Sequence, residues 1–165
     1  MTDKEFSNAD FLTPVDICPL SSVLCRLMPA KTTRASVIPT MRYRAVNKAL
    51  ELLTKTFGFE EHAVYRDDKG NVVHAELSFG NGMIMIGPVT DTPFSRFMRQ
   101  PGEVGGITQS VYAIVTDPDA HHARTSAAGI EVVMPLRDES YGGREYSCRD
   151  FEGHIWTFGT YDPWK

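Results

Sequence analysis

Two stretches of similar build lie 71 residues apart in this chain of 165 residues. Asn81-Gly82 precedes the apolar run 83–86, and Glu152-Gly153 precedes the strand-like run 155–158, which is rich in aromatic and β-branched residues. Gly58 and Gly129, each at the end of a helix-like segment, have the same separation. Glycine can take the positive φ that a tight turn or a helix end requires. Two kinds of landmark at one spacing indicate an internal duplication.

Each half predicts the same order of elements. The apolar residues of segment 46–57 recur at the spacing of one helix face, and alternation over 72–79 is typical of a half-buried strand. For the first half we predict a strand at 36–43, a helix at 46–57 and strands at 59–66, 72–79 and 83–87. For the second we predict a strand at 109–115, a helix capped by Asp117, and strands at 130–134, 145–149 and 154–158. Both halves are therefore β-α-β-β-β units.

The duplication divides the chain into an extension and one domain. Residues 1–35 lie outside the repeat, and their prolines interrupt any helix or strand pattern. The domain spans 36–165, with a first module at 36–87, a linker at 88–107 and a second module at 108–161. We expect one or two helical turns at 94–99 within the linker.

Composition excludes several classes of function. The formal net charge is −4 and the chain has no block of Lys or Arg, which argues against a nucleic-acid partner. No apolar run has the length needed to span a bilayer, so we expect no membrane partner. Three cysteines without a C-x-x-C pair favour a reducing, cytoplasmic setting. Asp3 and Glu5 stand where a standard signal peptide carries basic residues.

The repeat also predicts a cavity. Each unit has a helix on one face of its strands, so two units side by side form a curved sheet whose inner face can hold a ligand. In strand 72–79 we expect Val73, Ala75, Leu77 and Phe79 to face the helix. His74 and Glu76 then point inward, about 6.6 Å apart along the strand.

Three motifs in this order resemble a known family. They are His74-Ala75-Glu76-Leu77, Tyr141-Gly142-Gly143-Arg144 and the segment from Asp150 to Trp156. Together with the two modules, they resemble the glyoxalase/bleomycin-resistance/dioxygenase superfamily, also called the vicinal oxygen chelate fold, over residues 36–161. The resemblance implies an α+β fold in which two β-α-β-β-β modules form a curved mixed sheet around a cavity. It also implies a small-molecule ligand and a homodimer.

Metal-dependent members of such a family carry ligands at matching inner strand positions. By motif, these positions fall on Ile38, Ile86, Gln109 and Thr157, and we expect the four to gather around one point. None of them is a histidine, a carboxylate or a thiolate, the groups that hold catalytic zinc or iron. The resemblance thus predicts no metal cofactor and argues against glyoxalase I or dioxygenase activity. A divalent metal at a relocated site is the alternative.

His74 and Glu76 are the candidate catalytic residues. They could bracket a polar ligand group, or act as a base and its orienting partner on an acidic C–H. The competing interpretation is a solvated strand face with two ordinary polar residues.

Further residues are candidates for ligand binding. Arg144 follows a glycine-rich loop and could hold a carboxylate or a phosphate, although an ion pair with Asp138 or Glu139 explains it equally well. Alternation places Arg42 beneath the same cavity. The predicted ligand-binding set is Arg42, His74, Glu76, Gln109, Tyr141, Arg144 and Thr157. Outside this set, we expect Trp156 in the core, His154 as a structural residue, Cys148 buried and inert, and His121 and His122 in solvent.

Two functions remain open from the sequence. The first is a metal-independent binder of small molecules, either metabolites or drugs. The second is a glyoxalase-like lyase or isomerase that uses His74 and Glu76, with or without a divalent metal. Whether the protein is an enzyme at all is left open.

Overall fold

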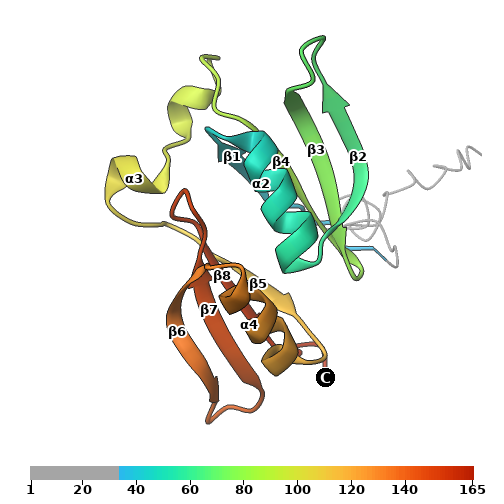
Figure 1. The fold of residues 1–165 in the computed structure, drawn as a ribbon, viewed down its shortest axis with the longest axis vertical. Coiled ribbons are helices and arrows are strands. Elements are labelled where there is room, and N and C mark those ends of the chain that lie inside the picture. Colours follow the sequence, from blue (N-terminus) through green and yellow to red (C-terminus); the bar gives the residue numbers. More distant parts are fainter. Residues whose placement is uncertain (1–33) are drawn as a thin grey trace, which may run out of the picture. The chain divides into compact units, whose positions relative to one another are not determined.

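The computed structural model describes residues 34–165, and most of the predicted extension lies outside them. The first module comprises β1 (Thr40–Tyr43), α2 (Val46–Glu51) with its wider continuation η1 (Leu52–Phe57), β2 (Glu60–Arg66), β3 (Val72–Phe79) and β4 (Gly82–Pro88). The linker holds η2 (Ser95–Phe97) and α3 (Pro101–Val104). The second module comprises β5 (Val111–Ile114), α4 (Pro118–Ala127), β6 (Glu131–Asp138), β7 (Arg144–Arg149) and β8 (Ile155–Gly159) (Figure 1).

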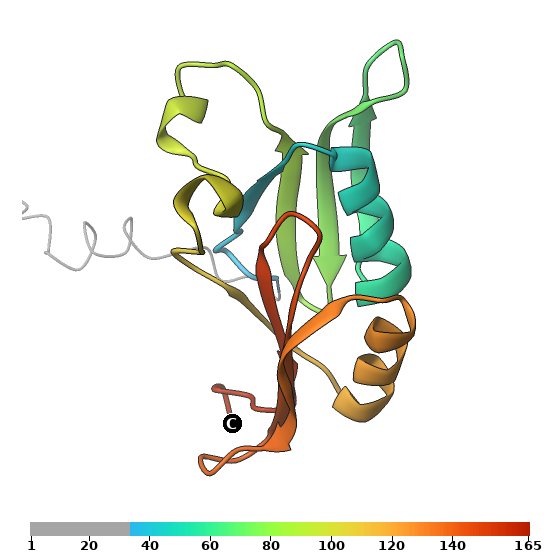
Figure 2. The ribbon, with the colours of Figure 1, turned by 60° about the vertical axis from the view of Figure 1, so that its left-hand side comes forward.

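The predicted α+β fold of two β-α-β-β-β modules is confirmed. Its strands form two four-stranded sheets, with the orders β1-β4-β3-β2 and β5-β8-β7-β6. In each sheet the first strand of the module runs parallel to the last, and the other neighbours are antiparallel. Figures 1 and 2 show one helix on one face of each sheet. No helix within residues 34–165 is long and apolar enough to cross a membrane.

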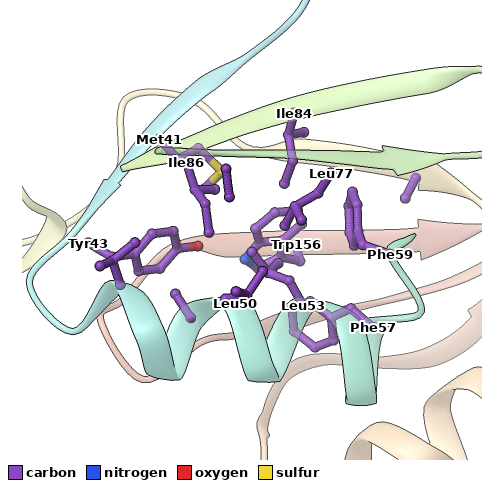
Figure 3. Packing of buried hydrophobic residues seen from close by; sticks show 14 of the residues in the cluster. Met41, Tyr43, Leu50, Leu53, Phe57, Phe59, Leu77, Ile84, Ile86 and Trp156 are labelled. Carbon is purple, nitrogen blue, oxygen red and sulfur yellow. The ribbon is translucent and has the colours of Figure 1, made fainter. Parts of the chain in front are cut away.

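The apolar stripe of the first helix builds the core of the first module. Val46, Ala49, Leu50, Leu53 and Phe57 are all buried. Figure 3 shows side chains of this helix facing Leu77, Ile84 and Ile86 of the sheet. The helix ends at Gly58, which takes a φ of 87° and lets the backbone N–H of Phe59 bond to the carbonyl of Leu53. Burying each large apolar side chain contributes about 1.5–3 kcal/mol.

The two modules share one core. Trp156 and Phe158 of β8 lie 5.5 and 5.0 Å from Phe57 between ring centroids, so the second sheet packs directly on the end of the first helix. This confirms the expectation that Trp156 is a core residue. The Asp117 carboxylate caps α4 by accepting from the N–H of Ala120 at 2.9 Å, as predicted.

A buried histidine joins the modules, against our expectation that it is solvated. His121 is 6% exposed, and its Nε2 donates to the carbonyl of Phe57 at 3.0 Å. The Tyr146 hydroxyl bridges Nδ1 of His121, at 2.7 Å, and the hydroxyl of Thr125, at 2.8 Å. The prediction failed because α4 turns the face that carries His121 toward the end of the first helix, an arrangement that periodicity alone does not reveal.

The turn Asp150–Gly153 holds the second module to the start of the first helix. The Asp150 carboxylate accepts from the Tyr43 hydroxyl at 2.8 Å and from Nε1 of Trp156 at 3.2 Å. The Glu152 carboxylate accepts from the backbone N–H groups of Arg44 and Ala45, at 2.8 and 2.7 Å. These N–H groups have no partner within the helix, so Glu152 serves as a cap supplied by the other module. These contacts hold the end of β1 and the start of the first helix to the second module.

Strand faces differ from the sequence prediction in two places. Leu77 pairs with Ile84, but Cys148 pairs with Trp156, so the second hairpin is one residue longer than the first. A one-residue slip moves a side chain to the opposite face. In β3, a register irregularity buries Val72 and leaves Val73 45% exposed, although alternation had assigned Val73 to the helix side.

Candidate functional site

A pocket of about 710 Å³ lies where the start of β1, the linker and the start of β5 meet. Figure 2 shows the linker running beside β1. Part of the wall is apolar, from Ile38, Phe97, Met98, Val104, Ile107 and Ile155. Polar side chains also line it, among them Arg42, Arg99, Gln100, Gln109, Tyr112 and His154. This size and mixture are typical of sites for small organic molecules.

Arg42 reaches the pocket because strand alternation turns it away from the core. Its neighbours Met41 and Tyr43 are buried, so Arg42 points to the opposite face of the sheet. Across the sheet it pairs with Gly87, and a Cβ at that glycine would overlap Nη1 of the guanidinium. Among residues 34–165, no carboxylate forms an ion pair with Arg42. The pocket therefore contains an unneutralised cation.

Tyr112 and His154 were not predicted as part of a ligand site. The Tyr112 hydroxyl accepts from the backbone N–H of Tyr161 at 3.1 Å, and burial with the nearby Glu145 raises its pKa to about 12. His154 was expected to be structural, and its Nε2 donates to the carbonyl of Arg42 at 3.3 Å while the residue lines the pocket. Because Tyr112 alternates with the buried Ala113, strand alternation could have predicted that Tyr112 faces away from the core, toward the pocket.

The candidate catalytic pair lies elsewhere on the first sheet. Nε2 of His74 is 3.4 Å from Oε1 of Glu76, and their side chains are 38% and 29% exposed. Nε2 of His62 lies 4.0 Å from the other carboxylate oxygen. His62 arrives there because an irregularity in β2 inserts it between the pairs Glu61–Leu77 and Ala63–Glu76. Neither His74 nor Glu76 is among the residues that line the pocket.

Arg144 forms the ion pair that was its alternative interpretation. Its guanidinium donates to both oxygens of Asp119, at 2.8 and 3.0 Å, and to Asp138 at 3.1 Å. These hydrogen bonds raise the pKa of Arg144, which stays charged. Asp138 was foreseen as a partner, whereas Asp119 comes from α4 and was not. Tyr141 stands apart from the pocket and packs edge-on against Tyr161, with ring centroids 5.5 Å apart.

The four positions inferred for inherited metal ligands do not gather around one point. Ile86 is 1% exposed and packs in the core between its sheet and the first helix (Figure 3), on the opposite face from Ile38 and Thr157. The one-residue slip explains this error, because the register of Met41 with Ile86 matches that of Ala113 with Phe158. The corresponding inner set is Ile38, Met85, Ser110 and Thr157, again without a histidine, carboxylate or thiolate. The Thr157 hydroxyl bonds to that of Ser147 at 2.8 Å.

The structure thus brings two of the predicted ligand-binding residues, Arg42 and Gln109, into one pocket. In the part of the chain that the structure describes, no three His, Cys, Asp or Glu side chains form a group that could hold a metal ion. Cys148 is buried, as expected, and burial raises the pKa of its thiol to about 12, which leaves it protonated and unreactive.

Comparisons with solved structures agree with the fold. TioX from Micromonospora sp. ML1 is 31% identical, with a TM-score of 0.58, and the match covers 74% of this chain and 95% of TioX. The fosfomycin resistance protein FosX from Listeria monocytogenes is 18% identical, with a TM-score of 0.57, over 77% of this chain and 93% of FosX. The second likeness shows the fold alone.

Sequence relatives are less informative about function. An uncharacterised protein of Mycobacterium bovis is 28% identical over 111 residues, which is 67% of this chain and 73% of that protein. An uncharacterised protein of Mycobacterium tuberculosis matches at the same identity over 65% of its length. The family model of the Glyoxalase/Bleomycin resistance protein/Dioxygenase superfamily matches residues 38–158. Two repeated modules, their register and this match lead to one conclusion: the chain belongs to the Glyoxalase/Bleomycin resistance protein/Dioxygenase superfamily.

Proposed function

We propose that this protein is a metal-independent binder of small organic molecules, and that its site is the pocket lined by Arg42, Gln109 and Tyr112. The observation that carries the proposal is the pocket itself, with about 710 Å³ of space and a wall that is partly apolar and partly polar. Such a wall removes an organic ring from water and orients its polar groups. Sequestering a metabolite or a drug needs nothing more than this.

A thermal-shift screen followed by calorimetry tests the proposal. The screen uses aromatic and dicarbonyl compounds, both neutral and anionic, with the full chain. A ligand present at about 100 times its Kd adds about 2.7 kcal/mol of stability, which raises Tm by several degrees. Gln109→Leu at the pocket wall should weaken binding of a hit. If every compound in the screen leaves Tm unchanged, the proposal fails.

Arg144 distinguishes the site seen in the structure from the wider set predicted by sequence. Arg144 is engaged by Asp119 and Asp138, so Arg144→Gln should leave the Kd of a hit unchanged. A loss of affinity equal to that of Gln109→Leu would instead place the ligand near Tyr141 and Arg144.

Metal independence is tested on the same protein. We expect elemental analysis of the purified chain to find no stoichiometric metal, and EDTA to leave both Tm and ligand affinity unchanged. If zinc, nickel or manganese copurifies at one ion per chain and is lost in His74→Ala, the metal-independent proposal is wrong.

A second candidate function is a lyase or isomerase of the glyoxalase-like type. The observation that favours it is the 3.4 Å approach of His74 to Glu76, a distance from which one residue can orient the other. The pair lies outside the pocket wall, which is why we rank it second. Turnover of a dicarbonyl compound that disappears in both His74→Gln and Glu76→Gln would reverse this order.

We also propose that the protein forms a homodimer in the cytoplasm, without nucleic acid or membrane. Apolar side chains on strand faces turned away from the core support the dimer, since Tyr112, Ile114 and Met134 of the second sheet are each about two-fifths exposed. Light scattering after gel filtration checks it, and a mass near 18.4 kDa at all concentrations would argue against it.

A further inference from the structure

We propose that the ligand of this pocket is an organic acid, whose carboxylate binds the guanidinium of Arg42 above Gly87 and whose apolar body lies along the linker. This inference rests on the proposed function of a small-molecule binder and adds the chemical class of what is bound. It follows from the charge of the wall, from the position of Arg42 and from the apolar residues opposite.

The charge of the pocket wall is opposite to that of the chain. The protein carries 21 acidic residues and 17 lysines and arginines, yet the described wall contains Arg42 and Arg99 and neither Asp nor Glu. A pocket lined by one sign of charge attracts ligands of the other sign. A neutral or cationic ligand would gain nothing from this distribution.

Arg42 differs from the other arginines whose ion pairs are seen. Arg99 approaches Glu103 at 4.0 Å, and Arg144 holds two aspartates. Within residues 34–165, Arg42 has no such partner, although its side chain is partly buried. A partly buried guanidinium without a counter-ion leaves its five N–H donors available to a ligand, in the fork geometry that suits a carboxylate.

The backbone beneath Arg42 leaves room for its guanidinium. Gly87, the partner of Arg42 in the sheet, has no side chain, and a Cβ there would overlap Nη1 of Arg42. The neighbouring residue Tyr43 is bound to Asp150, and His154 donates to the carbonyl of Arg42. These contacts fix the backbone from which the Arg42 side chain extends over Gly87.

The rest of the wall selects an apolar body for the ligand. Phe97, Met98, Val104 and Ile107 come from the linker, and Ile38 and Ile155 come from the strand ends. Methionine side chains adapt to apolar groups of different outline. A carboxylate attached to an aromatic or alicyclic ring satisfies both halves of the pocket.

The test compares a matched pair of probes, 1-naphthaleneacetate and its neutral amide 1-naphthaleneacetamide, by isothermal calorimetry on the full chain. We expect the acid to bind at least about tenfold more tightly than the amide, the effect of one charge-assisted hydrogen-bonded pair. Added salt should weaken binding of the acid and leave binding of the amide unchanged, since screening acts only on the charged probe.

Two variants locate the effect. Arg42→Gln removes the charge, and Gly87→Ala keeps the charge but displaces the guanidinium with a methyl group. Each variant should weaken binding of the acid about tenfold and leave the Kd of the amide unchanged. Gly82→Ala is the matched control on the same strand, because its Cβ would meet only the carbonyl of Phe79 at 3.4 Å. Circular dichroism checks that each variant is folded. If Gly87→Ala does not fold, the test depends on Arg42→Gln alone.

The outcomes separate this inference from the proposed function. If acid and amide bind equally, or if both variants leave the acid unaffected, the pocket binds ligands but the inference of an anion is wrong. If neutral compounds of the wider screen bind while the acid shows no heat up to about 1 mM, the result is the same. If nothing binds, both the inference and the proposed function fail.

Discussion

Replacing Asp150 with asparagine should be among the most costly single changes in this protein. The residue is 4% exposed and its carboxylate has four donors. Oδ2 accepts from the Tyr43 hydroxyl and from Nε1 of Trp156, while Oδ1 accepts from the N–H groups of Glu152 and His154, at 3.0 and 2.9 Å. The Tyr43 phenol donates and stays neutral, because burial and the Asp150 charge raise its pKa. Asparagine has the same shape but only one acceptor oxygen.

The magnitude follows from counting what that oxygen can still accept. If it stays with the two backbone N–H groups, the new amide NH₂ faces two donors. The tyrosine hydroxyl can rotate and accept, but the indole N–H has no alternative. Losing one hydrogen bond to a charge costs about 1.5–3 kcal/mol, and a buried unpaired N–H costs about 1–3 kcal/mol. The sum, about 2.5–6 kcal/mol, is a large share of the 5–15 kcal/mol that usually stabilises a domain.

Urea unfolding followed by far-UV circular dichroism measures this cost. Tyr43→Phe is the matched control, because it removes one donor and leaves the carboxylate with three, for an expected loss of about 1.5 kcal/mol. The double variant should cost less than the sum of the two, since both changes remove the same contact. If Asp150→Asn lowers the free energy of unfolding by less than about 1 kcal/mol at an unchanged m-value, the turn Asp150–Gly153 does not hold the two modules together as argued.

Three further predictions concern single buried groups. Burial lowers the pKa of His121 below its usual value near 6.5, so the stability that the neutral ring contributes is present above that pH and is lost as pH falls through the lower folded-state value. The urea midpoint should therefore fall between pH 7.5 and 5.5 in the native chain, and fall less in His121→Gln. Equal slopes of midpoint against pH in the two proteins would contradict this. Cys148, with a pKa near 12, should react with a thiol reagent only as fast as the protein unfolds in a C18S/C25S background, so rapid labelling of the native chain would count against it. Gln100 is 6% exposed and its Oε1 lacks a hydrogen-bond partner in the described part of the chain, so Gln100→Met should raise the free energy of unfolding by about 1 kcal/mol, and a decrease would show that a partner exists.

The sequence predicted those features that local chemistry determines. The helix 46–57 follows from its apolar stripe, and its end follows from Gly58, which takes a positive φ. The cap of α4 follows from Asp117, and the two hairpins follow from their glycines. In each case a residue and its near neighbours carry the whole signal, so no knowledge of the other module is needed.

Contacts between the modules were beyond this reasoning. His121 and Glu152 meet residues of the first module, and nothing in the sequence near them marks these partners. The same holds within the second module for Asp119, the partner of Arg144. The face of Ile86 was wrong for a different reason. A spacing of 71 residues holds for the turns, but the longer second hairpin shifts the last strand by one position, and one position reverses a strand's faces.

The two modules repeat one backbone feature beside the pocket, and the difference between the copies gives the site its charge. Arg42 pairs with Gly87, and at the corresponding place Ile114 pairs with Gly159. A Cβ at Gly159 would overlap the Tyr112 hydroxyl, as one at Gly87 would overlap Arg42. The Tyr112 hydroxyl is neutral and already accepts a backbone N–H, whereas the Arg42 cation has no partner within residues 34–165. We therefore expect the proposed ligand to place its carboxylate at Arg42, because the reversed orientation would place it against the neutral phenol of Tyr112.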